Sequence, residues 1–108
     1  MNPVLDKEIK FHGYTCVINQ ARYADGSLAL QLVDKNFGDP VAMITTRIDG
    51  LEQDELAIKN WSENEGMYTT LLRAGVVRRA HRSVRSGFVT VPVTRLAKEV
   101  EDAGSDRD

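Results

Sequence analysis

Two apolar segments joined by an Asp-Gly turn constrain the fold of this chain more than any other feature. Residues 14–23 are rich in β-branched and aromatic side chains, and residues 28–33 alternate so that three leucines share one face. Between the two segments stands Ala24-Asp25-Gly26-Ser27. Asp-Gly is among the strongest short hairpin signals because both residues tolerate a positive φ. The sequence therefore predicts an antiparallel β-hairpin in the first third of the chain.

A single helix is predicted in the second half of the chain. Ser62 is followed three residues later by Glu65, the spacing of a capping box, in which each side chain bonds to the backbone N–H of the other residue. Apolar residues then recur at helical spacing, and Gly75 is a typical helix-ending residue with Arg73 in the last turn. We therefore expect Ser62 and Glu65 to be structural residues at the helix start.

The remaining strands are short. They are predicted at residues 8–11, 41–46, 56–58 and 88–94. Pro92 cannot donate a backbone hydrogen bond, so we expect the last of these strands at a sheet edge. The pattern as a whole predicts an α+β fold, an antiparallel sheet of about five or six strands with one helix packed on one face. Residues 1–96 would form this single domain, and residues 97–108 an acidic, disordered tail.

Composition limits the size, location and cofactors of the protein. A chain of 108 residues with 42% hydrophobic content fits one small domain with one core. A single cysteine, Cys16, cannot form an intramolecular disulfide, and no apolar run is long enough for a membrane span or a signal peptide. One cysteine and two distant histidines, His12 and His81, predict no metal site. We therefore expect a cytoplasmic protein without a membrane anchor, metal or other cofactor, in which Cys16 is a buried structural thiol.

Charge is unevenly distributed along the second half of the chain, although the formal net charge is only −2. Residues 49–65 contain six acidic residues and one lysine, whereas residues 73–95 contain six arginines and no acidic residue. The first segment predicts an acidic partner-binding surface formed by Asp49, Glu52, Asp54 and Glu55. The second predicts a basic surface that binds a partner or nucleic acid, formed by Arg73, Arg78, Arg79, Arg82 and Arg85.

These two surfaces leave several interpretations open. The acidic surface suits a basic groove that normally holds nucleic acid, because carboxylates imitate phosphates there. Guanidinium groups suit phosphates, bases or the carboxylates of an acidic protein, and the same arginines also fit an ordinary solvated loop and strand edge. Phe88 is the nearest aromatic residue, so a protein partner fits at least as well as nucleic acid.

Catalytic motifs are absent from the sequence. It contains no glycine-rich phosphate loop, nucleophile elbow, His-Glu-x-x-His motif or calcium loop. His81 with Glu63 or Glu65, and with Tyr68 as a proton donor, is the one grouping suited to acid–base chemistry. Carboxylates in a first helical turn and a histidine among arginines have sufficient structural explanations. We therefore expect a protein that is not an enzyme.

Five segments carry a resemblance to a known family: Tyr23–Asp34, Gly38–Ala42, Ile58–Met67, Leu72–Val76 and Ser86–Val93. The most specific of them contains Ser-Glu-Asn-Glu-Gly at residues 62–66. In these segments the chain resembles a family of small bacterial proteins of unknown function that phages and other mobile elements often carry. Trp61 and the run Arg78-Arg79-Ala80-His81-Arg82 depart from the pattern of that family. The resemblance implies no catalytic residue. It does imply a mobile-element accessory protein, including an inhibitor of a host defence system such as CRISPR.

Together these observations predict a non-enzymatic binding protein that occupies the surface of a host protein complex, one that handles nucleic acid in defence. The alternative is a small nucleic-acid-binding protein that uses the basic segment from Arg78 to Arg85. The sequence leaves the oligomeric state open.

Overall fold

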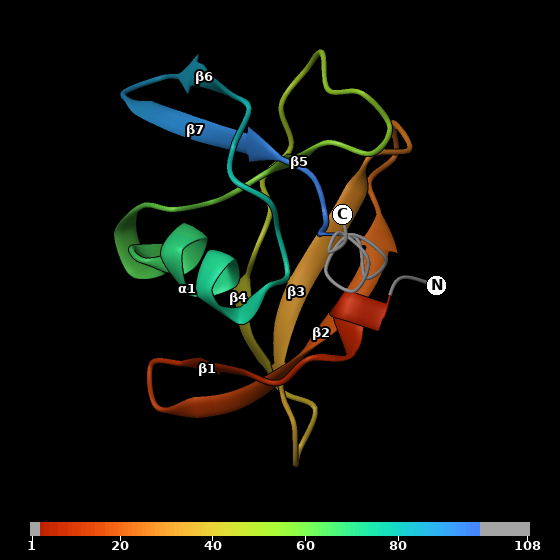
Figure 1. The fold of residues 1–108 in the computed structure, drawn as a ribbon, viewed down its shortest axis with the longest axis vertical. Helices are drawn as coiled ribbons and strands as arrows, with labels where there is room; N and C mark the ends of the chain where they lie inside the picture. Colours follow the sequence, from red (N-terminus) through yellow and green to blue (C-terminus); the bar gives the residue numbers. More distant parts are fainter. Residues whose placement is uncertain (1–2, 98–108) are drawn as a thin grey trace, which may run out of the picture.

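The computed structural model describes residues 3–97 and shows an α+β fold, with two antiparallel sheets and one α-helix among those residues (Figure 1). The first sheet has the strand order β1-β2-β3-β4, with β1 (Ile9–Phe11), β2 (Tyr14–Arg22), β3 (Leu28–Asp34) and β4 (Pro40–Met43). The second has the order β5-β7-β6, with β5 (Leu56–Ala57), β6 (Arg82–Ser86) and β7 (Val89–Thr94). The helical segments are the 3-10 turns η1 (Pro3–Asp6) and η2 (Ser62–Asn64) and the helix α1 (Met67–Ala74).

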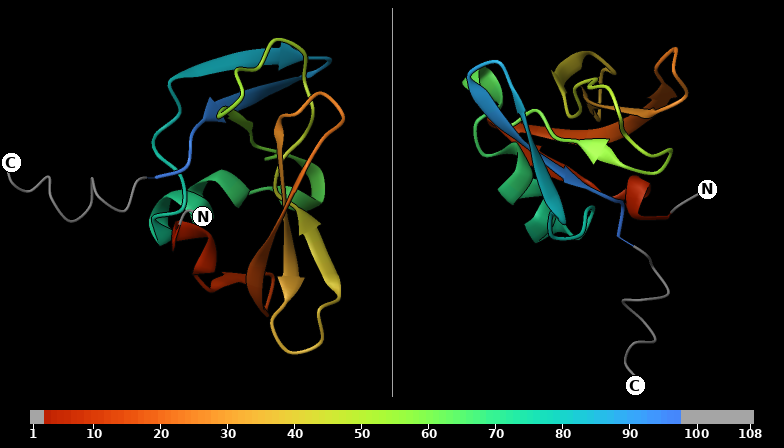
Figure 2. Two further views of the ribbon diagram at one scale, coloured as in Figure 1. Left: turned by 90° about the vertical axis from the view of Figure 1, so that its right-hand side faces the viewer. Right: turned by 90° about the horizontal axis from the view of Figure 1, so that it is seen from above.

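The prediction of a single sheet is wrong, because the chain changes partners within the strand predicted at residues 41–46. The first half of that segment, β4, pairs with β3, whereas Thr45 forms an isolated bridge with Ile58. Two backbone hydrogen bonds of 2.9 Å join residues 44–46 to residues 57–59 beside this bridge. The two sheets meet at this junction and run in different directions from it (Figure 2).

The hairpin of β2 and β3 has the predicted strands and turn. Residues 16–22 pair antiparallel with residues 28–34. At the turn, the Asp25 carboxylate accepts hydrogen bonds from the backbone N–H and the hydroxyl of Ser27, at 2.9 and 2.6 Å. Gly26 has a φ of 89°, which a residue without a side chain adopts at little cost. The local signal was sufficient here because every contact of the turn lies within a few residues.

The capping box predicted at Ser62 and Glu65 is wrong. The α-helix begins five residues later, at Met67, and neither η2 nor α1 has a side-chain hydrogen bond at its N-cap. Ser62 has a φ of 56°, and Gly66, the N-cap of α1, has a φ of 92°. Side-chain capping normally needs an extended backbone at the N-cap, and both of these residues are left-handed. The chain therefore makes a 3-10 turn, reverses at Gly66 and only then starts α1.

Two asparagines hold the start of the helix in place of the predicted capping box. The side-chain oxygen of Asn60 accepts a hydrogen bond from the N–H of Tyr68, the second residue of α1, at 2.8 Å. Asn64 is almost fully buried, and its side-chain amide donates to the carbonyl oxygens of Met43 and Lys59. The Ser-Glu-Asn-Glu-Gly element therefore acts through its central asparagine, which ties the helix start to the junction of the two sheets.

The end and the apolar face of the helix agree with the prediction. Gly75 has a φ of 78°, and its N–H donates to the carbonyl oxygen of Leu72 at 3.1 Å, as a left-handed C-terminal glycine does. The apolar stripe of α1 is fully buried at Met67 and Leu71. The helix contacts β1 and encloses one side of the core (Figure 1).

The expectation that Pro92 lies at a sheet edge is also wrong, because β7 is the central strand of the second sheet. Its neighbour β5 pairs only with Val93 and Thr94. Pro92 faces the end of this short ladder, where its carbonyl oxygen accepts a hydrogen bond from Ile58 N at 3.0 Å. The N–H that Pro92 lacks would point to the same side. There the segment that follows β5 turns away from β7 toward the first sheet. A proline is tolerated there because the ladder ends.

The fold extends to the C-terminal end of the described region. Ala97 is buried and its N–H donates to Val76 O at 2.9 Å, so this residue belongs to the fold and not to the predicted acidic tail. The rest of that tail, residues 98–108, lies outside the described residues. Cys16 is buried, as expected, and burial raises the pKa of its thiol. Of the helices in the described region, none has the length and apolar character needed to cross a membrane.

Replacing Asn64 by alanine is expected to lower the free energy of unfolding by about 1–3 kcal/mol, because two carbonyl groups lose their donor. Ser62→Ala is the control, since Ser62 is exposed and its side chain does not cap the turn. Its expected effect is within about 0.5 kcal/mol. Urea unfolding followed by circular dichroism measures both. An equal loss from the two variants would contradict the assignment to Asn64.

Candidate functional site

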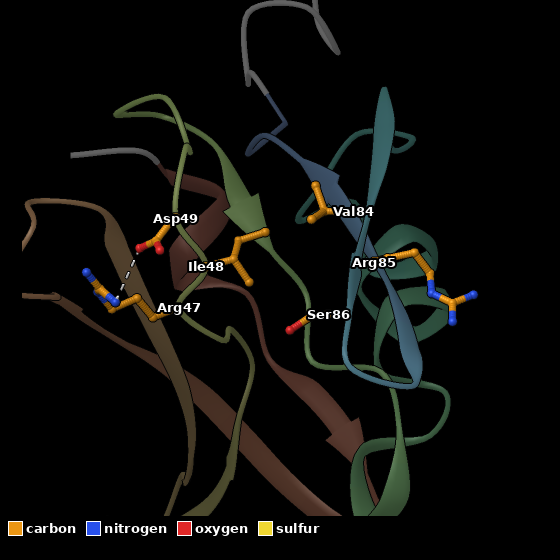
Figure 3. A pocket seen from close by; sticks show the side chains of 6 residues that line it. All are labelled: Arg47, Ile48, Asp49, Val84, Arg85 and Ser86. Atoms are coloured by element: carbon orange, nitrogen blue, oxygen red, sulfur yellow. Dashed lines mark ion pairs between the residues drawn. The ribbon is translucent and has the colours of Figure 1, made fainter.

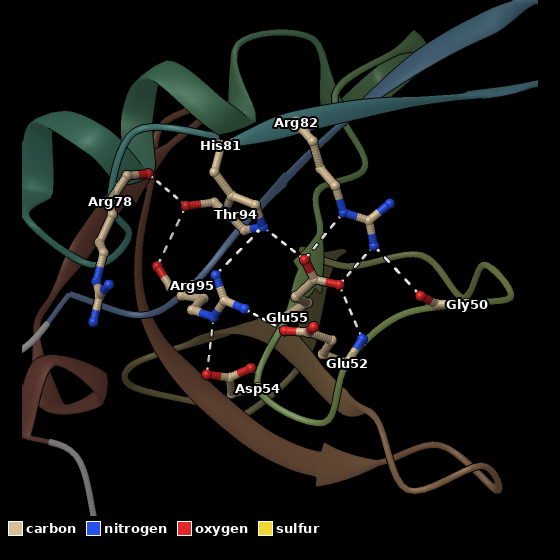
Figure 4. A network of polar contacts seen from close by, with 9 residues as sticks. All are labelled: Gly50, Glu52, Asp54, Glu55, Arg78, His81, Arg82, Thr94 and Arg95. Atoms are coloured by element: carbon tan, nitrogen blue, oxygen red, sulfur yellow. Dashed lines mark hydrogen bonds and ion pairs between the residues drawn. The ribbon is translucent and has the colours of Figure 1, made fainter.

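Glu55, which directly precedes β5, is the centre of a polar network (Figure 4). Its side chain is only 3% exposed. Arg82 donates two hydrogen bonds to it, from Nη2 to Oε1 at 2.6 Å and from Nε to Oε2 at 3.1 Å. His81 Nε2 donates to Oε2 at 2.6 Å, and the backbone N–H of Glu52 donates to Oε1 at 2.9 Å. The buried carboxylate is therefore bound on both of its oxygens.

Arg95, which follows β7, forms the second half of the network. Its Nε donates to Asp54 at 2.9 Å and its Nη2 donates to Glu52 at 2.5 Å. Its Nη1 lies 3.4 Å from His81 Nε2, so His81 stands between the two halves (Figure 4). The two halves together fasten the base of hairpin β6–β7 (residues 82–94) to the acidic segment before β5.

The network strongly favours the charged form of Glu55. The hydrogen bonds from Arg82 lower the pKa of this carboxyl far below its ordinary value, and the Glu52 N–H and His81 add to the effect, although burial alone would raise it. In return, Glu55 raises the pKa of Arg82. Asp54 likewise raises the pKa of Arg95. Glu55 is therefore ionised at neutral pH, and its buried charge is balanced by a bidentate arginine.

The residues of the acidic surface predicted from the sequence form ion pairs with arginines of the same chain. Glu55 is buried, so its assignment to an exposed surface is wrong. Glu52 and Asp54 have side chains that are 69% exposed, but both pair with Arg95. Asp49 has the most exposed side chain of the four, at 94%. The charges are segregated in the sequence, yet hairpin β6–β7 brings the two signs together in space.

The predicted basic surface is also reduced by ion pairing within the chain. Arg82 stays 41% exposed, but its guanidinium group is paired with the buried Glu55. The backbone of Arg78 is fixed beside the network, where its carbonyl oxygen accepts a hydrogen bond from the Thr94 hydroxyl at 2.6 Å. Three more of the predicted arginines are exposed, namely Arg73, Arg79 and Arg85. They come from different segments, α1, the following loop and β6, so proximity in the sequence overstated the size of the basic patch.

A cleft of about 360 Å³ lies between β6 and the loop that follows the sheet junction (Figure 3). Ile48 of the loop and Val84 of β6 supply its apolar walls, and Ser86 lies on the same side of β6 as Val84. Arg85 stands between these two residues, and its guanidinium group points away from the cleft, as strand alternation requires. The volume is at the small end of the range for ligand sites, about 300–1,000 Å³.

The loop wall of the cleft is tied to the rest of the fold by Arg47. This side chain forms ion pairs with Asp25, in the turn of the β2–β3 hairpin, at 3.4 Å, and with Asp49 at 3.7 Å. The lining of the cleft therefore combines two apolar side chains with charged and polar ones. It could not be predicted from the sequence because its two sides are more than 30 residues apart.

Phe88 is fully exposed at the turn of hairpin β6–β7. Phe37, in the loop between β3 and β4, is 80% exposed, and Tyr14 is half exposed. Burying a phenylalanine side chain stabilises a protein by about 1.5–3 kcal/mol relative to leaving it in water. Exposed aromatic residues therefore mark surface that gains free energy when another molecule covers it.

The grouping of His81 with Glu63 that would suit acid–base chemistry, and that we did not expect to be catalytic, does not form. His81 binds Glu55, whereas Glu63 pairs with Lys59 at 3.0 Å. The pair of Glu55 and His81 was missed because the residues are 26 positions apart and no local pattern connects them. In the described part of the chain, no three His, Cys, Asp or Glu side chains are grouped so that they could hold a metal ion.

No protein-family model, curated protein or solved structure matches this chain. The resemblance to proteins of mobile elements therefore stays a prediction.

Replacing Glu55 by glutamine is expected to lower the free energy of unfolding by about 1–3 kcal/mol, because a charged hydrogen-bond acceptor is lost from a buried position. Glu52→Gln is the matched control. It removes the same charge from a side chain that is 69% exposed, so the expected loss is below about 1 kcal/mol. Urea unfolding at pH 7 compares the two variants with the parent chain. Equal losses would contradict a special role for the buried carboxylate.

The pH dependence of stability should also depend on Glu55. Its pKa is lowered in the folded state, so its contribution is complete above the ordinary glutamate pKa of about 4.3 and is lost as the pH falls below that value. The unfolded chain then binds a proton that the folded chain does not. We expect the free energy of unfolding to fall less steeply below about pH 5 in Glu55→Gln than in the parent chain. Parallel curves would contradict this.

Proposed function

We propose that this chain is a non-enzymatic binding protein that occupies the surface of a larger protein complex through the tip of hairpin β6–β7. The observation that carries the proposal is the full exposure of Phe88, three residues after an Arg85 whose guanidinium group points into solvent. Aromatic residues and arginine are enriched among the residues that dominate binding energy at protein interfaces. An exposed ring close to a guanidinium group suits a partner pocket with apolar walls and an acidic rim.

The attachment of the hairpin base supports this proposal. Arg82 binds the buried Glu55, and Arg95 binds Glu52 and Asp54, so both ends of the hairpin are held. A contact surface that is already ordered loses less conformational entropy when it binds. The network positions the tip, and the tip contacts the partner.

The family resemblance adds the biological context of the proposal. It points, by association, to a host defence complex that handles nucleic acid, such as a CRISPR complex. Glu52 and Asp54 are exposed at the base of the same hairpin, and Asp49 is exposed in the loop beside β6. They would give the chain a second, acidic contact with a basic groove of such a complex.

Direct binding of nucleic acid is the alternative, and the exposure of Phe88 favours it because bases stack on exposed aromatic rings. Its footprint would be small, since Arg82 is paired with Glu55 and the other exposed arginines near the hairpin in sequence are Arg79 and Arg85. Two phosphate contacts predict a slope of about −1.4 to −1.8 for log K against log salt concentration. The formal net charge of −2 opposes this alternative.

Phe88→Ala and Arg85→Glu are each expected to weaken binding to the captured host complex by about 30-fold or more, the effect of losing an interface hot spot. The complex is identified by cross-linking and mass spectrometry, and affinities are then measured with the purified complex. Phe37→Ala and Arg73→Glu are the matched controls, because they make the same changes at exposed positions away from the hairpin. Both controls should bind like the parent chain.

Two results would contradict the proposal. Unchanged binding of the complex by Phe88→Ala would exclude the tip as the contact surface. Binding of short single-stranded DNA or RNA at low salt, lost in Arg85→Glu, would favour the alternative function.

A further inference from the structure

Strand β6 is an exposed edge of the second sheet. It is the outer neighbour of β7, and four of its five residues are exposed. The other outer strands of the two sheets are less available for pairing. Strand β1 contacts α1, β4 starts with Pro40, which lacks an N–H, and both residues of β5 are buried. Within the described region, β6 is therefore the sheet edge most open to another molecule.

The backbone groups of Ser83 and Arg85 point outward from this edge. In β7 the carbonyl oxygen of Val93 accepts a hydrogen bond from the residue before β6, whereas that of Pro92 accepts one from the residue after β5. Ser83 is the register partner of Pro92, so its N–H and C=O point away from β7, and those of Arg85 do the same. Within residues 3–97, these four groups have no hydrogen-bond partner.

We infer that β6 binds an extended segment of a partner protein, which adds an antiparallel strand to the second sheet on the outer side of β6. The four outward groups stand at the spacing of a β-ladder, and an extended polypeptide presents the matching donors and acceptors. The added strand belongs to the partner of the proposed function, on which this inference therefore rests. Edge-strand addition gains affinity from main-chain hydrogen bonds and specificity from side chains at alternate positions.

The two faces of β6 determine which side chains suit the added strand. Val84 and Ser86 face the cleft that Ile48 also lines, whereas the guanidinium group of Arg85 points away from it (Figure 3). Residues directly opposite each other in an antiparallel pair lie on the same face of the sheet. An acidic residue is therefore favoured opposite Arg85, and a β-branched residue is favoured opposite the half-buried Val84. The added strand should alternate acidic and apolar side chains.

Charge favours a partner segment over a second copy of β6. Residues 83–92, which form most of the hairpin, contain Arg85 as their only charged residue. If two β6 strands paired antiparallel along their full length, centred on Val84, their two Arg85 side chains would lie diagonally on one face and within reach of each other. An acidic strand makes the same arginine an attractive contact. The occupant that fits this edge is therefore an acidic segment of another protein.

The probe is an acetylated peptide of about seven residues that alternates valine and glutamate, added to the full chain at neutral pH. In the free chain, the amides of Ser83 and Arg85 should exchange with solvent at least about tenfold faster than those of Val84 and Ser86, which point toward β7. The peptide, at up to about 1 mM, should protect the two outward amides. A matched peptide of valine and lysine should bind at least about tenfold more weakly, because Arg85 repels it.

Ser83→Pro tests the backbone contact directly. Proline removes the outward N–H and no hydrogen bond of the β6–β7 ladder, and it is tolerated where the N–H of an edge strand faces solvent. Ser83→Ala is the matched control, because it changes the same side chain and keeps the N–H. Ser83→Pro should weaken binding of the valine–glutamate peptide at least about tenfold, and Ser83→Ala should bind it like the parent chain. Circular dichroism checks that both variants are folded.

Three results overturn the inference. They are slow exchange of the Ser83 and Arg85 amides in the free chain, no protection by the valine–glutamate peptide at about 1 mM, and equal binding by Ser83→Pro and Ser83→Ala. Slow exchange only at high protein concentration shows that a second copy covers β6, and this also overturns it. If Ser83→Pro does not fold, the comparison of the two peptides decides.

The proposed function is tested separately from this inference. None of these measurements involves Phe88 or the host complex, so a failure of the peptide experiments leaves the contact through the tip standing. Unchanged binding of the host complex by Phe88→Ala, in turn, removes the proposed function but does not alter the exchange of the β6 amides.

Discussion

The position of hairpin β6–β7 depends on one interaction, the bidentate pairing of the buried Glu55 with Arg82. A carboxylate removed from water needs an opposite charge and several donors, or it destabilises the fold. Glu55 stands just before β5 and Arg82 begins β6, and these are the two outer strands of the second sheet, separated by β7. The ion pair therefore spans the sheet and fixes strands that share no backbone hydrogen bond. Arg95 strengthens the same attachment through Asp54 and Glu52.

The surface left available for binding follows from this attachment. Because the network neutralises Arg82 and Arg95, the charges that remain on the hairpin are few, and its tip is dominated by one aromatic ring and Arg85. The network also holds the acidic segment near β6, and the loop before it forms the second wall of the cleft.

The Ser-Glu-Asn-Glu-Gly element shows how a correct local pattern can have a different structural role. The spacing of Ser62 and Glu65 satisfies the requirement for a capping box, but the pattern says nothing about where Asn64 lies. Asn64 is drawn into the interior, where it bonds to carbonyl oxygens of Met43 and Lys59. The chain around it then adopts a 3-10 turn and a left-handed Gly66, and the helix starts later. Tertiary contacts of one buried side chain outweighed a capping preference of about 1 kcal/mol.

The sequence by itself determined the features whose contacts are local. The α+β class, the β2–β3 hairpin at Asp25-Gly26 and the end of α1 at Gly75 were all predictable, because backbone conformation and alternation within a few residues decide them. Only the tertiary structure decided the division into two sheets, the burial of Glu55 and the cleft beside Val84. Glu55 and Arg82 are 27 residues apart, and a charge pattern along the chain does not show which opposite charges will meet. Long-range pairing depends on how the strands cross, and that information is not contained in any local period of the sequence.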